Sequence, residues 1–330
     1  MLDLSHILTA TLSLTGVSIV LSVIGCVVAF HQQGGGNFRD FLRYAFPREI
    51  VTQRTCYHDA GFILLKQFIR PWVAAPLLLL TSVKCAELSY AGLGAVFGAR
   101  PQAAMPLGLF VVLLILAVLI QDFFRFGIHY TLHRFGVLWD VHKVHHSAKF
   151  LTPMTNHRTH VIEELLQQGA TGLSVGPVLA LAAFLSGTSL STSTLLGFDA
   201  YLLIDTLSFA MLRHSHVGLS FGAFERYLMS PKQHHMHHSA DQRHWDKNFG
   251  FLFACWDRMA GTICYSNPRE SIRFGIAPEE AVYYNTVLKL HFMPYIKLFQ
   301  RCVPYFERRR PIVTVGPGSD LRVEPMPKEV

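Results

Sequence analysis

Charged side chains are scarce in this chain of 330 residues, and the shortage argues against an ordinary soluble domain. Charged residues make up 15% of the sequence, whereas 51% of it is hydrophobic. Soluble domains carry about a quarter charged residues, which cover a surface that faces water. The composition therefore predicts a protein whose surface faces a lipid bilayer over much of its area.

Closely spaced cysteine pairs are missing as well. The 6 cysteines are scattered along the chain, and no two of them form a C-x-x-C pair. This makes a zinc knuckle or a disulfide framework a poor interpretation, because both depend on characteristic cysteine spacings. We expect reduced thiols that pack as small hydrophobic side chains.

Long apolar runs, in contrast, are frequent, and they lie at 8–30, about 72–96, 105–120, about 166–185 and about 194–211. The first run carries no charge and is long enough to cross a bilayer. No basic segment precedes it, so we expect a membrane anchor rather than a cleaved signal peptide. The second run is interrupted by Lys84 and Glu87, which leaves a kinked or re-entrant hairpin open.

The distribution of positive charge predicts the orientation of these runs, because cytoplasmic loops are enriched in lysine and arginine. Six basic residues separate the first two runs: Arg39, Arg43, Arg48, Arg54, Lys66 and Arg70. The next connection holds Arg100 and, if it lies outside the run, Lys84. We therefore expect residues 31–70, 121–165 and 212–330 on the cytoplasmic side and the amino terminus outside.

Histidines gather in two of these cytoplasmic segments. Of the 18 histidines, only His6, His31, His58 and His291 lie outside residues 129–244. Three clusters stand out by their spacing: "HYTLH" with His129 and His133, "HKVHH" with His142, His145 and His146, and "HHMHH" with His234, His237 and His238.

These spacings of three and four residues place the imidazoles of each cluster on one face of a helix. Imidazole suits iron, zinc, copper and nickel, and eight imidazoles exceed the four ligands of a structural zinc site. The pattern predicts two metal ions with open coordination positions. A flexible, metal-gathering tract is the alternative, but such tracts are of low complexity, whereas these clusters lie among residues such as Phe123 and Trp139.

The order H-x-x-x-H, H-x-x-H-H and a distant H-x-x-H-H resembles the fatty acid hydroxylase/sterol desaturase superfamily over about residues 122–262. Arg158, His160 and Glu163 match a further R-x-H-P-x-E element, with Val161 in place of proline. "LRHSHVGL" resembles an H-S-N segment at His214 and Ser215, with His216 replacing asparagine.

The resemblance implies a non-haem di-iron centre that uses O2 and two electrons to hydroxylate or desaturate a lipid. The implied ligands are His129, His133, His142, His145, His146, His234, His237 and His238, with His214 as a ninth. His160 is a candidate tenth ligand or a residue next to one, and the status of His216 stays open. Glu163 and Asp246 are expected to orient ligand imidazoles, whereas His157, His235 and His244 are expected to be bystanders. Zinc can replace iron in such a site.

The electrons are expected to come from an external donor. The sequence has no H-P-G-G motif of a fused cytochrome b5 domain and no G-x-G-x-x-G. A cytochrome b5-like protein, or a ferredoxin with its reductase, would be attracted by basic residues such as Arg308, Arg309 and Arg310. The same charge could instead contact anionic lipid. No nucleic-acid partner is expected.

The resulting expectation is an all-α integral membrane protein with four to five transmembrane helices and a cytoplasmic helical cap that carries a histidine-ligated dimetal site. We divide it into transmembrane helices at 1–120, a catalytic domain at 121–265 with a transmembrane hairpin at about 166–211, and a cytoplasmic tail at 266–330. Asp199 and Asp205, inside the fifth run, would either pair with a neighbouring helix or line a lipid tunnel. The rival functions are a metal-transporting or metal-storing membrane protein and an inactive, lipid-binding homologue.

Overall fold

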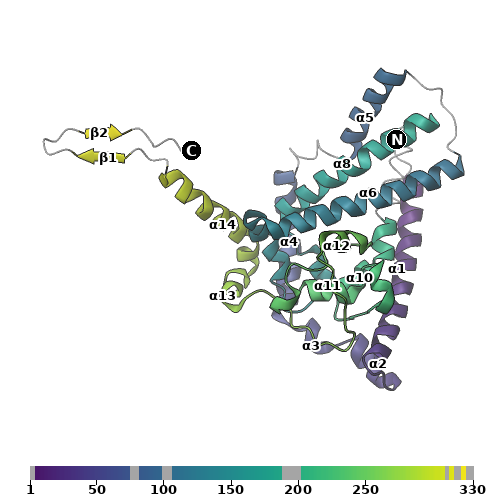
Figure 1. Cartoon of the computed structure of the whole chain (residues 1–330). Helices are drawn as coiled ribbons and strands as arrows, with labels where there is room; N and C mark the ends of the chain where they lie inside the picture. The colour runs from purple at the N-terminus through teal and green to yellow at the C-terminus, as the bar shows by residue number, and fades with distance from the viewer. Residues whose placement is uncertain are drawn as a thin grey trace.

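The computed structural model describes residues 4–74, 82–98, 106–187, 202–308, 312–315 and 321–324, which are mostly helical (Figure 1). The longer helices are α1 (Leu4–Gln32), α4 (Arg54–Ala74), α5 (Ser82–Phe97), α6 (Leu107–Arg134), α7 (Gly136–His146), α8 (Val161–Ser186) and α14 (Val287–Arg308). The shorter α-helices are α2 (Phe38–Ala45), α3 (Arg48–Val51), α10 (Ala210–Arg213), α11 (Pro231–His237), α12 (Cys255–Ala260) and α13 (Pro278–Ala281). Short 3-10 helices are η2 (Pro153–His157), η3 (Gly222–Arg226), η4 (Gln242–His244) and η5 (Val282–Tyr284).

The expectation of a helical chain is confirmed, with one departure among the described residues. Strands β1 (Ile312–Val315) and β2 (Leu321–Glu324) form a two-stranded antiparallel hairpin beyond α14, away from the body of the molecule (Figure 1). Their sequences, IVTV and LRVE, contain the β-branched residues that favour extended backbone. The sequence had suggested no strand there.

Three helical segments of the described chain are long and apolar enough to cross a bilayer, at Thr15–Gln32, Leu107–Arg134 and Val161–Ser186. They coincide with the first, third and fourth predicted runs. The second predicted run begins in α4 and continues into α5, but residues 75–81 between them lie outside the described part. Residues 194–201 of the fifth run, which include Asp199, also lie outside the described part.

Helix α8 packs against both α5 and α6, and these helices lie side by side at one end of the molecule (Figure 1). Their core contains Ala86 of α5, Ala117 of α6 and Val175 and Leu179 of α8. Small residues allow the backbones to approach closely: a Cβ atom added to Gly176 would lie 2.5 Å from the Cβ of Cys85. The packed helices α5 and α8 thus share a core with the apolar half of α6.

The short helices α10, α11 and α12 lie together in a second region below α6 in the view of Figure 1. Helix α7 contacts α6, which precedes it in the chain. One buried cluster there joins Phe62 of α4, Val144 of α7 and Leu290 of α14. Another joins Ala29 of α1 to Leu212 of α10 and to Leu219. Cys26, Cys56, Cys85, Cys255 and Cys264 are free thiols.

Candidate metal centre

Two consecutive helices supply the first five histidines of the site. His129 and His133 stand one turn apart near the end of α6. Phe135 has an extended backbone conformation that ends α6 and precedes α7. His142, His145 and His146 lie in the last two turns of α7, and nearly all of each side chain is buried. The short connection between α6 and α7 therefore places the first two histidine clusters next to each other.

The third cluster lies on α11, which starts from a strong cap. The Ser230 hydroxyl accepts from the backbone N–H of Gln233, and the Gln233 side chain accepts from the backbone N–H of Ser230. Such a reciprocal cap satisfies two donors that the first turn would otherwise leave unpaired. It fixes a helix of 7 residues that carries His234 and His237, with His238 as its carboxyl-terminal cap.

The structure gathers nine histidines into two buried groups. The five-histidine group contains His129, His133, His142, His146 and His237. The four-histidine group contains His145, His214, His234 and His238. Within each group, one ring nitrogen from every histidine lies within 4.8 Å of the others. These are the eight histidines of the three clusters together with His214, which the sequence proposed as a ninth ligand.

Each H-x-x-H-H cluster is divided between the groups. In α7 the pair at four-residue spacing, His142 and His146, joins the five-histidine group, and His145 joins the other. In α11 the assignment is reversed, since His234 and His238 enter the four-histidine group and His237 the five-histidine group. Each of these two clusters therefore supplies two histidines to one group and one to the other, so both groups need both clusters.

The arrangement of the ring nitrogens fits metal ions. The Nε2 atoms of His234 and His214 are 2.9 Å apart, and those of His145 and His214 are 3.0 Å apart. Nε2 of His133 and Nε2 of His237 are buried and have no hydrogen-bond partner among the described residues. Buried polar atoms are almost always paired, so converging lone pairs without partners are what an imidazole-held metal ion would satisfy.

One loop and one helix orient the outer nitrogens of the five-histidine group. Nδ1 of His129 donates to the Phe249 carbonyl, and Nδ1 of His237 donates to the Lys247 carbonyl, each at 2.8 Å. Asp246 Oδ1 lies 3.4 Å from Nδ1 of His133. From α8, Glu163 Oε2 lies 3.0 Å from Nδ1 of His142. The two acidic residues expected to orient imidazoles therefore stand beside two of the predicted ligands.

Two buried acidic side chains, to which the sequence analysis assigned no role, hold the loop at 246–253 in position. Asp122 of α6 accepts from the backbone N–H groups of Leu252 and Phe253 and from the Trp256 indole. Asp257 accepts from two further N–H groups of the loop and from the Thr262 hydroxyl. An ionisable residue at the end of an apolar run, as Asp122 is, was a usable signal, because such a group needs a partner in the protein.

Asn248 fixes the turn of this loop. It is fully buried, and its side chain donates to the Gln233 and Cys264 carbonyls and accepts from the Cys264 N–H. Asp246 and Asn248 both have left-handed backbone conformations, with φ of 55° and 59°. Asparagine and aspartate tolerate this conformation better than other residues with a Cβ atom, which explains their spacing in "DKNFG".

Burial keeps the histidines of the site neutral. Desolvation lowers the pKa of His145 to about 3 and that of His237 to about 3, from an ordinary value of 6.5. It also lowers the pKa values of His146, His214, His234 and His238. A neutral imidazole has a lone pair to offer, so these side chains are competent metal ligands at neutral pH.

The other histidines at 129–244 lie outside both groups. His160, the candidate tenth ligand, caps α8: its Nδ1 accepts from the Ile162 N–H, and its Nε2 lies 3.0 Å from the His291 carbonyl. With both ring nitrogens held by the backbone, it has no free position for a metal. Nε2 of His216 lies 2.8 Å from the Tyr44 carbonyl, and His235 faces the Leu212 carbonyl. His157 ends the 3-10 helix η2 and also belongs to neither group.

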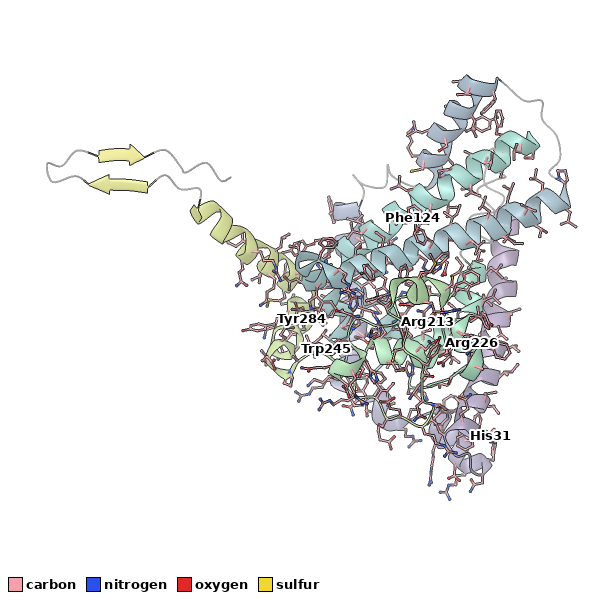
Figure 2. All side chains as sticks on the ribbon, in the orientation of Figure 1. His31, Phe124, Arg213, Arg226, Trp245 and Tyr284 are labelled. Atoms are coloured by element: carbon pink, nitrogen blue, oxygen red, sulfur yellow. The ribbon has the colours of Figure 1, made fainter. Side chains whose placement is uncertain are left out.

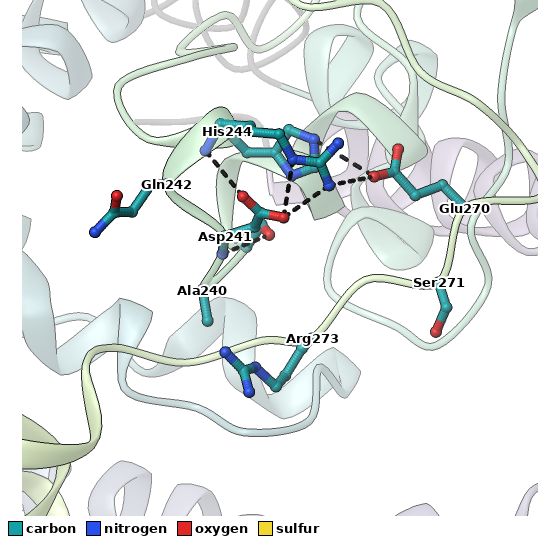
Figure 3. Close-up of a pocket in the computed structure, with 9 residues that line it drawn as sticks. Ala240, Asp241, Gln242, His244, Glu270, Ser271 and Arg273 are labelled. Carbon is teal, nitrogen blue, oxygen red and sulfur yellow. Dashed lines mark hydrogen bonds and ion pairs between the residues drawn. The ribbon is translucent and has the colours of Figure 1, made fainter.

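His244 instead borders a polar pocket on the surface (Figure 3). Asp241, Arg243 and Glu270 line the same pocket, and Nε2 of His244 lies 3.7 Å from Glu270. None of the nine grouped histidines lines it. The pocket is therefore a separate feature of the surface near the third cluster.

Asp205 pairs with the neighbouring helix, which is the first of its two predicted roles. Its carboxylate lies 3.2 Å from the Arg125 guanidinium of α6. Arg125 also stacks on the Phe251 ring, 4.1 Å from its centroid. The stacking of Arg125 on Phe251 links the carboxyl-terminal half of α6 to the loop at 246–253.

Comparison with known proteins agrees with this geometry. Residues 114–262 match the family "Fatty acid hydroxylase". Curated relatives include alkylglycerol monooxygenases from Caenorhabditis elegans (23% identical, over 56% of this chain and 34% of that protein), Danio rerio (24%, 62% and 42%) and Homo sapiens (24%, 60% and 40%). The chain thus spans well under half the length of these relatives. No solved structure gives a significant match. The resemblance to the fatty acid hydroxylase/sterol desaturase superfamily is confirmed.

Proposed function

We propose that this protein is a membrane-bound oxidoreductase of the monooxygenase type that acts on a lipid. The observation that carries the proposal is the convergence of nine buried imidazoles into two groups, all within the segment that matches the fatty acid hydroxylase family. The monooxygenase relatives support the same reaction class. A membrane setting is supported by the three apolar helices.

The proposed cofactor is a pair of iron ions, one held by the five-histidine group and one by the four-histidine group. Iron held by imidazoles would supply O2 activation and the attack on an unactivated C–H bond, which no amino-acid side chain can provide. The protein contributes the ligands and their orientation. Glu163, Asp246 and the carbonyls of Lys247 and Phe249 hold the imidazole rings in place from outside.

The proposed substrate is a lipid that enters from the bilayer. The names of the relatives make alkylglycerols the first lipids to test and favour hydroxylation over desaturation. Two electrons would come from an external donor, such as a cytochrome b5-like protein or a ferredoxin with its reductase. The apolar helices α6 and α8, which lead into the site, would keep water away from the reacting carbon.

For the membrane arrangement we propose four to five spans with the metal centre on the cytoplasmic side. Three spans are the apolar helices described above, and the predicted runs at 72–96 and 194–211 would supply the others. The basic residues between the first two runs support the cytoplasmic side. We keep the division into helices at 1–120, a catalytic domain at 121–265 and a tail at 266–330.

The test compares variants of the two groups in purified protein. His237→Ala removes a residue of the five-histidine group, and His145→Ala one of the four-histidine group. Both should lose bound iron and lower the turnover of an alkylglycerol by roughly a hundredfold. His235→Gln is the matched control, because it changes a buried neighbour on α11 that belongs to neither group.

The measurements are iron per chain and O2 uptake driven by ferredoxin, its reductase and NADPH. Retained turnover in either alanine variant would contradict the ligand assignment. Iron binding without reductant-dependent O2 uptake for any lipid would favour a metal-storing or metal-transporting protein. A chain with neither iron nor O2 uptake would be the lipid-binding homologue.

A further inference from the structure

The outer nitrogens of the two histidine groups meet opposite kinds of partner. In the five-histidine group, Nδ1 of His129 and Nδ1 of His237 donate to carbonyls at 2.8 Å. Nδ1 of His142 and Nδ1 of His133 lie 3.0 and 3.4 Å from the carboxylates of Glu163 and Asp246, although the contact between His142 and Glu163 does not have hydrogen-bond geometry. An acceptor at Nδ1 fixes the proton there, leaves Nε2 free for a metal and makes the imidazole a more basic ligand.

In the four-histidine group, a hydrogen-bond donor lies next to the outer nitrogen of one histidine, His234. Nη2 of Arg213 lies 3.2 Å from Nδ1 of His234. A guanidinium has no acceptor, so at this contact the histidine accepts. Nδ1 of His145 and Nδ1 of His214 are buried and have no hydrogen-bond partner among the described residues. This group thus has a cation next to one of its outer nitrogens, whereas four outer nitrogens of the other group lie beside carbonyls or carboxylates.

Arg213 is held firmly in this position. Its guanidinium donates to the Phe251 carbonyl at 2.8 Å and to the Gly250 carbonyl at 2.9 Å, and it stacks on the Phe251 ring. The side chain lies in the interior among the short helices, with 3% of its surface exposed (Figure 2). Burial lowers the pKa of Arg213 to about 10, so it remains charged at neutral pH. Solvent therefore screens its charge very little.

We propose that the two metal positions are unequal and that Arg213 is the positioning residue that makes the four-histidine position the weaker, exchangeable one. The inference rests on the proposed metal centre. A fixed positive charge next to a ligand opposes a second cation. A donor at Nδ1 also favours the tautomer of His234 that carries its proton on Nε2, and this proton must leave before Nε2 can bind a metal. The position also has one imidazole fewer, which leaves more room for other ligands.

Stepwise metal removal tests the inference in the full chain. The protein is loaded with Zn2+ in detergent, dialysed against increasing concentrations of EDTA, and its zinc per chain is measured. We expect two steps whose EDTA midpoints differ by about tenfold or more, the size of effect that partners of metal ligands usually have. His237→Ala should keep only the labile step, and His238→Ala only the resistant one.

Three substitutions isolate the charge. Arg213→Gln keeps donors for the loop carbonyls but removes the charge, and it should move the labile step about tenfold toward the resistant one. Arg213→Lys should keep the wild-type midpoints. Arg125→Gln is the matched control, because it removes a second guanidinium that stacks on the same Phe251 ring. It should leave both steps unchanged.

Two zinc ions released at the same EDTA concentration would overturn the inference and leave the metal centre standing. An Arg213→Gln variant whose two EDTA midpoints both equal those of the wild type would also overturn it. A chain that takes up no zinc or iron would overturn the metal centre and this inference together. No turnover measurement is needed for any of these outcomes.

Discussion

The buried ion pair between Arg158 and Asp59 offers a quantitative test of how the metal centre is supported. Their side chains are 1% and 0% exposed, and the nitrogen and oxygen atoms lie 2.7 Å apart. Arg158 also donates to the Val144 carbonyl at 2.9 Å and to the Ser147 hydroxyl at 2.6 Å. These two partners flank His145 and His146, one histidine of each group.

Arg158→Met leaves the Asp59 carboxylate buried without its countercharge. Removing one partner of a buried pair destabilises a protein by about 3–5 kcal/mol. At about 2 °C per kcal/mol, the midpoint of thermal unfolding should fall by roughly 6–10 °C. Because the last turn of α7 loses its anchor, metal should be lost from both positions.

The double variant Arg158→Met/Asp59→Leu replaces the pair by apolar side chains. Such replacements are often close to neutral, since both desolvation penalties disappear together. Thermal unfolding followed by circular dichroism should therefore recover more than half of the loss. A single variant within 1 °C of wild type, or a double variant as unstable as the sum of both single variants, would refute this reasoning.

Three further predictions concern packing, ligand orientation and acid. Gly176→Val should lower the unfolding midpoint by several degrees, because its Cβ would lie 2.5 Å from that of Cys85 and overpacking costs about 1–3 kcal/mol. Glu163→Gln should weaken metal binding about tenfold in an EDTA titration, and an unchanged midpoint would speak against its orienting role. The metal-free protein should lose stability as pH falls below about 6.5, because the unfolded chain then binds protons that buried His145 and His237, with pKa values of about 3, do not bind. A thermal midpoint that is constant from pH 7.5 to 5 would contradict this.

Local periodicity made much of the site predictable. Residues three and four apart on a helix share a face regardless of what surrounds the helix, so the three clusters could be read as metal-binding faces from their spacing alone. Apolar runs are similarly local, and three of the five predicted spans correspond to long apolar helices. The role of the histidines as ligands stays a prediction until metal is measured.

Contacts between distant segments could not be read in this way. The spacing of H-x-x-H-H places three imidazoles on one face but does not divide them between two groups, because that division depends on how α7 and α11 cross. His160 matched a family motif, yet its backbone contacts separate it from both groups. Arg213 lies within the segment "LRHSHVGL", but the match there rests on His214 and Ser215 and predicted no role for it. Its contacts with His234 and with the Gly250 carbonyl join residues far apart in the sequence.

The sequence by itself determined a helical membrane protein with histidines at metal-binding spacing, because composition and helical repeat are properties of short segments. Tertiary structure alone decided which imidazoles converge, which carbonyls and carboxylates hold their outer nitrogens, and where a buried guanidinium lies. Those features depend on side chains far apart in the chain, whose distances are fixed only when the helices pack.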